Sequence, residues 1–187
     1  MLKKLEEYGK FVGITGFRGV KVGDARVFVD AVCQGLPANV EVQLFDADLV
    51  ASWGHLYFAA LNALTAFRNK RNLSRSLAVE AALYASSQRQ IRKALDFIGV
   101  KTESVNVAVV VFGGDVGSVE AGLSAVASCM GADPDDGVLE LSEAKIRRIR
   151  AAFEVSDAEL QAASNHDPNK ALVDLIIERS ALLSTRL

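Results

Sequence analysis

The sequence predicts a single α+β domain, in the broad α/β class, that spans residues 1–187. The length is typical of one domain, and a hydrophobic content of 50% with a mean hydropathy of +0.21 indicates a substantial buried core. Short apolar runs of strand length are interspersed with longer segments of helical periodicity. We therefore expect a small mixed four-stranded sheet with a helix-rich insertion and a helical C-terminus.

The expected strands are short runs rich in branched and aromatic residues. Apolar and polar side chains alternate over residues 40–45, the pattern of a strand with one buried face. The run at 105–112 is almost continuously apolar, which predicts the centre of the sheet. The strand order is not readable from the sequence, and we expect mixed pairing with helices on one or both faces. The four predicted strands are residues 11–15, 40–45, 105–112 and 138–141.

The first helix is predicted at residues 25–34, where Asp24 can cap its start and Gly35 can end it, with Pro37 just beyond. A longer helix at residues 51–68 is apolar around most of its circumference. Such a helix is expected at the centre of the fold, because its side chains must be covered from several directions.

Two shorter helices are expected after the long one. Ser74 or Ser76 opens the first of them. Ser87 and Gln90 form the capping-box pattern S-x-x-Q, which predicts the start of the second, and Gly99 ends it.

Helices also make up most of the C-terminal part. A glycine-rich loop, GGDVGS, precedes the first of these helices, and Ser142 is placed to cap the second. Ser156 and Glu159 form another capping box, S-x-x-E, for the third. The expected ranges are 118–130, 142–153, a helix opened by Ser156, and 168–183.

The residues show no catalytic constellation. His55 lies inside the apolar helix, where a packed structural residue is expected, and His166 is expected to be a solvated turn residue. Asp46 and Asp48 lie at a strand-to-helix junction, where a helix cap is favoured over acid–base chemistry. No serine lies in a G-x-S-x-G elbow. The sequence therefore predicts a protein that is not an enzyme.

No cofactor, metal ion or membrane attachment is predicted. The GGDVGS loop can offer backbone N–H groups to a phosphate, but it lacks the glycine spacing and the lysine of nucleotide-binding loops. Cys33 and Cys129 have no metal-ligand spacing and are expected to be buried, reduced thiols of a cytoplasmic protein. No apolar run reaches the roughly 18–20 residues of a membrane span, and the N-terminus lacks the apolar region of a signal peptide.

Positive charge is concentrated in one segment of a chain whose net charge is −2. Seven of the 21 Lys and Arg residues lie between Arg68 and Lys93, with Glu80 as the single acid among them. Because acids are so scarce there, i,i+4 ion pairs are not expected to neutralise the segment. Three interpretations compete: a solvated helix face, a surface for an acidic protein partner, or a nucleic-acid site in which Tyr84, Phe67 or Leu73 packs on an unpaired base.

The same segment carries a family resemblance. The run SLAVEAALYASSQRQIRKALDFIGV resembles the small regulatory subunit of the KEOPS (EKC) complex, the TPRKB-like family, in its Ser-Leu-x-x-Glu helix and its SQRQI motif. The segment VQLFDADLVASWGHLYFAALNAL, with His55, and the C-terminal run ALVDLIIERSALL are similar to the same family. The similarity covers most of residues 40–187, and Trp53–Gly54 departs from it, since family members often show a proline and an acidic residue there.

The resemblance implies a non-catalytic subunit that binds the N-terminal lobe of the KEOPS kinase/ATPase and, in archaea, helps to hold tRNA through its single-stranded 3′ end. The complex makes N6-threonylcarbamoyladenosine in tRNAs that read codons beginning with A. The expected tRNA surface consists of Arg68, Lys70, Arg71, Arg75, Arg89, Arg92 and Lys93. The expected kinase surface is the last helix, where the candidate anchors are Leu172, Ile176, Leu182 and Leu183, some of which could equally be core.

Two other functions remain open. One is a protein–protein adaptor without RNA binding, whose basic segment contacts an acidic partner. The other is a small-ligand enzyme that uses Asp46, Asp48, His55 and the GGDVGS loop.

Overall fold

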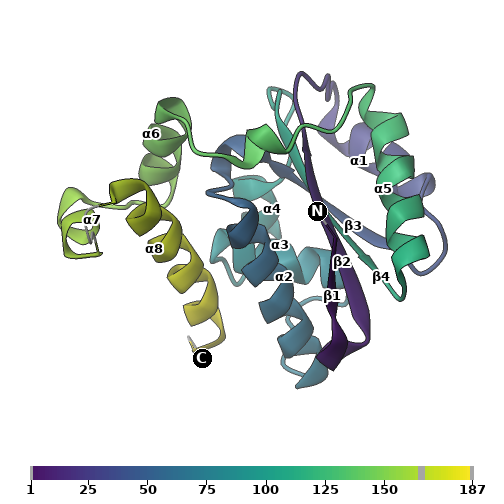
Figure 1. The fold of residues 1–187 in the computed structure, drawn as a ribbon, viewed down its shortest axis with the longest axis horizontal. Helices are drawn as coiled ribbons and strands as arrows, with labels where there is room; N and C mark the ends of the chain where they lie inside the picture. The colour runs from purple at the N-terminus through teal and green to yellow at the C-terminus, as the bar shows by residue number, and fades with distance from the viewer. Residues whose placement is uncertain (1, 164–166, 186–187) are drawn as a thin grey trace.

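The computed structural model describes residues 2–163 and 167–185. A four-stranded sheet in the order β1-β2-β4-β3 forms its centre, and every neighbouring pair of strands is antiparallel. Helices cover both faces of this sheet, and the C-terminal helices extend to one side (Figure 1). The strands are β1 (Leu2–Leu5), β2 (Lys10–Phe17), β3 (Glu41–Asp46) and β4 (Val107–Gly113).

Strand β4 lies inside the sheet and contributes to two separate hydrophobic clusters. Successive side chains of a strand point to opposite faces, so a strand covered on both faces needs a continuous apolar run. The central position predicted for residues 105–112 is therefore confirmed. One cluster takes Ala108, Val110 and Phe112, and the other takes Val107, Val109 and Val111.

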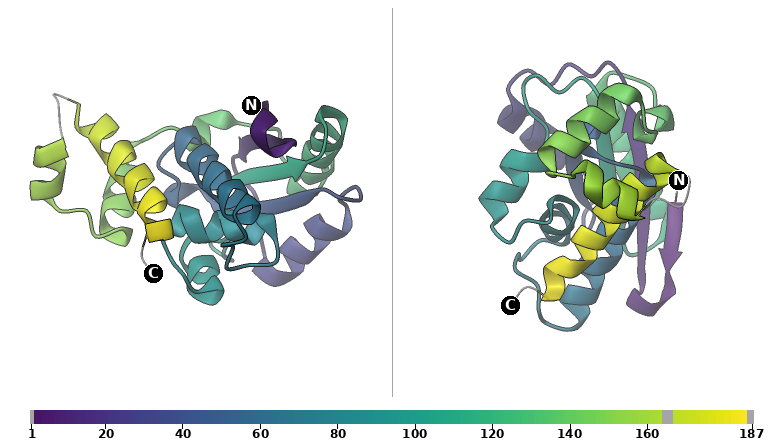
Figure 2. Two further views of the ribbon diagram at one scale, coloured as in Figure 1. Left: turned by 90° about the horizontal axis from the view of Figure 1, so that it is seen from below. Right: turned by 90° about the vertical axis from the view of Figure 1, so that its left-hand side faces the viewer.

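The two faces of the sheet are covered by different helices (Figures 1 and 2). Helices α1 (Ala25–Gln34) and α5 (Val116–Met130) cover one face, and α2 (Trp53–Arg68), α3 (Leu77–Ser86) and α4 (Ile91–Ile98) cover the other. A Cβ at Gly122 of α5 would lie 2.8 Å from Val40 and 3.0 Å from Val111, so glycine is what allows this helix to approach the sheet closely.

The last three α-helices form a third cluster beside α2 and α3. They are α6 (Glu143–Ala152), α7 (Asp157–Ala163) and α8 (Pro168–Leu182). Ser142 caps α6 by accepting a hydrogen bond from the Lys145 N–H, as predicted. The capping box at Ser156 and Glu159 is confirmed too, because each side chain accepts from the other residue's N–H.

The prediction of a strand at residues 138–141 is wrong. The chain forms a 3-10 helix there, η3 (Asp136–Leu139), because the Asp135 carboxylate caps it by accepting from Gly137 N–H at 2.9 Å. The fourth strand is β1, a short edge strand that the sequence prediction missed. It turns back onto β2 through the 3-10 helix η1 (Glu6–Tyr8) and Gly9, whose φ is +58°. The expectation of mixed pairing is also wrong, since all pairs are antiparallel.

Two smaller predictions need correction. Ser87 does not cap α4; it ends α3 with a φ of +55°, and Gln90 precedes α4 without a side-chain cap bond. Cys33 and Cys129 are exposed and not buried. His166 lies outside the described residues.

Candidate functional site

Two of the seven predicted cations, Arg71 and Arg89, meet in one cavity of about 580 Å³, which we call the basic cavity. Arg71 comes from the loop after α2, Arg89 comes from the turn between α3 and α4, and Tyr84 of α3 lines the same space. Two guanidinium groups, an aromatic ring and hydrogen-bonding side chains suit a ligand with anionic and planar parts. The other lining residues are Asn62, Thr65, Ala66, Asn69, Leu73, Leu183, Ser184 and Thr185.

Glu80, the single acid of the basic segment, holds the loop that carries Arg71. Its buried carboxylate accepts hydrogen bonds from the N–H groups of Leu73, at 2.9 Å, and Ser74, at 2.7 Å. Burial raises the pKa of Glu80, and the two backbone bonds partly oppose this rise. Burial likewise raises the pKa of Tyr84; Glu80 adds to that rise and Arg89 opposes it. Glu80 therefore fixes the Arg71 loop through its hydrogen bonds to the backbone, and it also helps to raise the pKa of Tyr84. Counting the charges in the sequence did not reveal this role.

Both loops at the basic cavity begin with the same backbone motif. Lys70 and Ser87 adopt φ values of +55°, in the left-handed region that favours glycine. After α2, the Arg71 N–H donates to Ala66 O at 2.9 Å; after α3, the Gln88 N–H donates to Leu83 O at 3.1 Å. These are Schellman ends, which reverse the chain sharply within one residue. The reversals bring the loops that bear Arg71 and Arg89 to one place.

Arg68 does not line the basic cavity. It lies 3.4 Å from a Glu7 carboxylate oxygen, and its guanidinium group stacks over the Tyr8 ring at 4.6 Å. These contacts place it on the side of α2 that faces η1. The structure thus separates Arg68 from the pair formed by Arg71 and Arg89.

The four remaining cations are exposed and also lie outside the basic cavity. Arg92 is 3.7 Å from Asp96, an i,i+4 pair that contradicts the expectation of an unneutralised helix face. Lys93 lines a small hollow with Asp96. Lys70 and Arg75 are exposed in the loop between α2 and α3.

Three of the four predicted kinase anchors are buried within the chain itself. Leu172 and Ile176 belong to the C-terminal cluster, and Leu183 packs into the main core while also lining the basic cavity. Leu182 is 40% exposed. Because a buried side chain cannot be an anchor for a partner without unfolding, only Leu182 of this set is available on the surface.

His55 is a buried structural residue, as predicted. Its Nδ1 accepts from Ala51 N–H at 3.2 Å and its Nε2 lies 2.9 Å from Ala85 O. This pattern requires the neutral Nε2–H tautomer, in which Nε2 donates to the carbonyl. Burial lowers the pKa of His55 to about 4. The imidazole therefore joins the start of α2 to α3, and it is not available as a surface base.

Asp46 and Asp48 form a structural clasp. Asp46 caps the 3-10 helix η2 (Ala47–Leu49) by accepting from Asp48 N–H at 3.1 Å, which confirms the cap prediction. Arg148 of α6 also donates to both carboxylates, at 2.8 Å and 2.9 Å. Beside them the buried Lys145 donates to Val138 O at 2.7 Å, and burial lowers its pKa to about 8. The Arg148 contacts join residues about 100 positions apart, so no local pattern in the sequence predicted them.

The GGDVGS loop is occupied by its own side chain. The Asp115 carboxylate accepts from the N–H and the Oγ–H of Ser118 at the start of α5, and these bonds lower its pKa. A carboxylate at this position competes with any phosphate. Within residues 2–163 and 167–185, the structure shows no cluster of His, Cys, Asp and Glu that could hold a metal ion. None of the helices in the same ranges is long and apolar enough to cross a membrane.

Comparison with known proteins places this geometry in a family. Residues 21–184 match the family model described as kinase binding protein CGI-121. The chain belongs to this family. It is also 28% identical over 142 residues to the regulatory protein Cgi121 of Methanocaldococcus jannaschii, across 76% of this chain and 83% of that protein. The resemblance to KEOPS regulatory subunits is thereby confirmed, and the family's description supports a kinase as partner.

Proposed function

We propose that the protein is a non-catalytic KEOPS subunit that binds the small kinase/ATPase of the complex and the single-stranded 3′ end of tRNA. In that role it supports synthesis of N6-threonylcarbamoyladenosine in the cytoplasm. Family membership supports the kinase half of the proposal. One observation carries the tRNA half: Arg71 and Arg89 share a cavity with Tyr84.

An unpaired tRNA end matches the chemistry of the basic cavity. Its phosphates suit the two guanidinium groups, and its bases can pack on aromatic and apolar side chains without being read as a duplex. Leu73, which is 45% exposed and lines the cavity, offers such an apolar surface, and Asn62 and Asn69 offer amide groups for base edges. Arg68, Lys70, Arg75, Arg92 and Lys93 then contribute only to the surrounding positive potential.

The double variant Arg71→Ala/Arg89→Ala tests the tRNA half. We expect at least about a tenfold loss of tRNA affinity, because two charge-assisted contacts are removed. With two phosphates released, the slope of log K against log salt should become less steep by roughly 1.4. The matched control is Arg75→Ala/Lys93→Ala, which removes the same charge outside the cavity and should change the affinity about twofold or less. Wild-type protein should also bind tRNA that lacks its CCA tail more weakly than full-length tRNA.

An unchanged tRNA affinity in the cavity variant would contradict the RNA half. If the kinase still bound in that case, the adaptor function, with the basic segment on an acidic protein, would replace it.

A further inference from the structure

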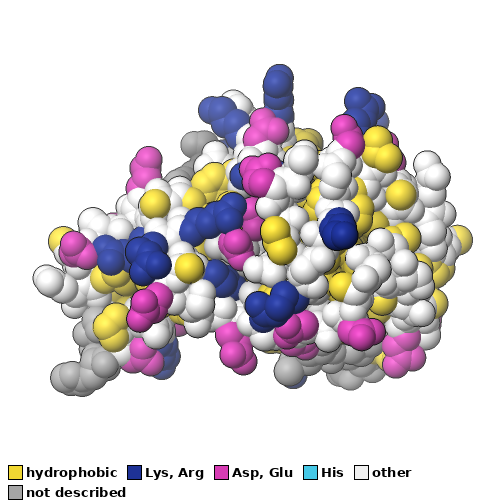
Figure 3. Space-filling model, turned by 90° about the horizontal axis from the view of Figure 1, so that it is seen from above, with side chains coloured by type: hydrophobic (Ala, Val, Ile, Leu, Met, Phe, Trp, Pro, Cys, Tyr) yellow, Lys and Arg dark blue, Asp and Glu magenta, His cyan; other side chains and the backbone are white. Residues whose placement is uncertain are grey.

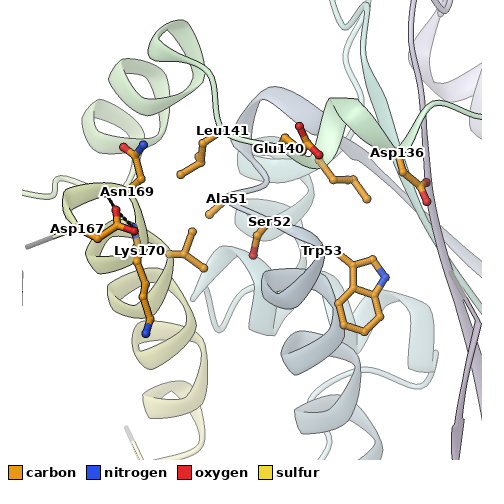
Figure 4. Close-up of a pocket in the computed structure, with 11 residues that line it drawn as sticks. Ala51, Ser52, Trp53, Asp136, Glu140, Leu141, Asp167, Asn169 and Lys170 are labelled. Carbon is orange, nitrogen blue, oxygen red and sulfur yellow. Dashed lines mark hydrogen bonds between the residues drawn. The ribbon is translucent and has the colours of Figure 1, made fainter. Parts of the chain in front are cut away.

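Two further cavities lie along α2 and α8. One, which we call the apolar cavity, has a volume of about 600 Å³ and lies where both helices begin, at the opposite end of α2 from the basic cavity (Figure 4). The other has a volume of about 700 Å³ and lies beside the last turns of α8, and we call it the acidic groove. Its size is within the range of roughly 300–1,000 Å³ that is typical of ligand sites.

Two sharp turns of the backbone shape the acidic groove. Ser87, after α3, and Glu154, after α6, both line it and both adopt left-handed conformations, with φ values of +55° and +53°. The turn after α6 repeats the Schellman end already described after α3, because the Val155 N–H donates to Arg150 O at 2.9 Å. The α3–α4 and α6–α7 turns are thereby fixed on either side of the groove, which is formed before any ligand binds.

Part of the lining of the acidic groove is apolar. Phe97 of α4 and Phe153, at the end of α6, meet edge-on with ring centroids 5.0 Å apart. Leu175 and Leu182 of α8 add to this surface, and Leu182 is 40% exposed. An apolar surface of this kind can cover the methylene stem of a long side chain whose charged end stays hydrated.

The ionisable side chains of the acidic groove leave a net negative charge. They are three carboxylates and one guanidinium group. Arg179 donates to Glu159 at 2.6 Å and to Phe153 O, so this cation is already paired. Glu154 and Glu178 are exposed, and neither has an ion-pair partner within residues 2–163 and 167–185. Two carboxylates are therefore available to a cation from outside.

This imbalance of charge is local. On the face of the molecule shown in Figure 3, positive and negative side chains are interspersed. The small hollow beside the groove, which shares Gln88 and Phe97 with it, holds one cation and one acid, Lys93 and Asp96. An uncompensated negative field attracts a cationic ligand and repels phosphates. The acidic groove therefore does not suit RNA.

Two uncharged polar side chains of the α3–α4 turn distinguish between kinds of cationic ligand. The Ser87 hydroxyl oxygen is buried and has no hydrogen-bond partner among the described residues. The side chain of Gln88, which also lines the groove, carries both donors and an acceptor. A polyamine offers N–H donors alone, whereas a peptide backbone offers donors and acceptors. These groups favour a peptide over a free polyamine.

We propose that the acidic groove binds a basic segment of a protein partner, with the stem of one arginine or lysine on the apolar lining and its charged group against Glu154 and Glu178. This interaction goes beyond the proposed function and does not depend on it, because none of the residues that line the groove lines the basic cavity. The bound segment lies on the other side of the turn that carries Arg89.

Titration of the full chain with two matched peptides tests this proposal, with backbone amide signals followed by two-dimensional NMR. One probe is an acetylated and amidated heptapeptide with a central arginine between two leucines. The other carries citrulline in place of the arginine, which keeps the shape and removes the charge. The arginine peptide should shift the signals of Ser87, Gln88 and Leu182 and bind at least about fivefold more tightly than the citrulline peptide, because only it makes charge-assisted contacts.

The double variant Glu154→Gln/Glu178→Gln removes both available charges and keeps the shape of the side chains. It should bind the arginine peptide at least about fivefold more weakly than wild type and the citrulline peptide within about twofold, because only the arginine loses charged partners. The matched control is Glu103→Gln/Glu120→Gln, which removes two exposed carboxylates outside the groove. It should bind the arginine peptide within about twofold of wild type.

Three results would overturn the proposal. The first is that wild type binds the arginine peptide no better than the citrulline peptide, or binds neither. The second is that the groove variant binds the arginine peptide as tightly as wild type does. The third is that spermine shifts the same signals while the arginine peptide does not, which would assign the groove to a free polyamine. The comparison of the two peptides on wild type needs no variant, so it decides the question even if thermal unfolding shows that the groove variant is misfolded.

Discussion

The basic and apolar cavities are each held in shape by one buried ionisable side chain, but the two are of opposite kinds. At the basic cavity, the Glu80 carboxylate accepts from the backbone of Leu73 and Ser74. At the apolar cavity, the His55 imidazole accepts from the backbone of Ala51, which lines the wall. Burial raises the pKa of Glu80 and lowers the pKa of His55 to about 4. In both cases the interior favours the neutral form.

This difference means that acid changes the contributions of Glu80 and His55 to the free energy of unfolding in opposite directions. The raised pKa of Glu80 makes its contribution to the free energy of unfolding fall as pH rises through that pKa, so this residue contributes most to stability in acid. The lowered pKa of His55 makes its contribution to the free energy of unfolding fall as pH drops from 6.5 towards about 4, so acid removes the stability that this residue provides. Titration of these two groups therefore changes the stability of the domain in opposite directions.

The largest expected effect is that of Glu80→Ala. The change leaves two backbone N–H groups without their buried acceptor, which should lower the free energy of unfolding by roughly 3–4 kcal/mol. Urea denaturation measures this loss of stability. The control is Glu120→Ala on the exposed face of α5, whose free energy of unfolding should stay within about 0.5 kcal/mol of wild type. In the folded variant tRNA affinity should fall while kinase affinity holds. An equal loss of both affinities would show that Glu80 supports the whole domain and not the basic cavity alone.

Acidification gives the next largest effect. Between pH 6.5 and about 4 the unfolded chain protonates His55 and the folded chain does not. Stability should therefore fall across this window, by roughly 3 kcal/mol from this residue alone. Thermal unfolding at stepped pH measures the fall, and His55→Gln, which has no titrating group, should show a flatter profile. If the His55→Gln variant lost stability as steeply over this pH range, the pH dependence would not come from His55.

Lys70→Gly gives the smallest effect and has the opposite sign. Lys70 occupies the left-handed region at a φ of +55°, where glycine avoids a steric penalty. The substitution should raise the free energy of unfolding by about 0.5–1 kcal/mol, after the extra chain entropy of glycine is subtracted. Because Lys70 does not line the basic cavity, tRNA affinity should change about twofold or less. A tenfold loss of tRNA affinity would mean that the RNA contacts the whole predicted cluster of cations and not the basic cavity alone.

Local signals explain which elements were predictable. The first helix, the Ser142 cap, the Ser156–Glu159 capping box and the central strand each depend on residues within a few positions of one another, and all four predictions are confirmed. The strand prediction for residues 138–141 failed because the Asp135 cap, which lies next to Gly16 of β2, overrode their strand-like composition. The prediction that Ser87 caps the next helix failed because an S-x-x-Q pattern does not distinguish a helix start from the left-handed end of the preceding helix.

The amino-acid sequence by itself determined the fold class, the family and the segment in which the cations gather, because these follow from composition, periodicity and short motifs. Only the tertiary structure decided that Arg71 and Arg89 share a cavity while Arg68 turns towards Tyr8. It alone decided that Leu172, Ile176 and Leu183 are buried and that the starts of α2 and α8 enclose a second cavity. The physical reason is that side-chain direction depends on how each helix ends and on what packs beside it, and these contacts join residues far apart in the chain.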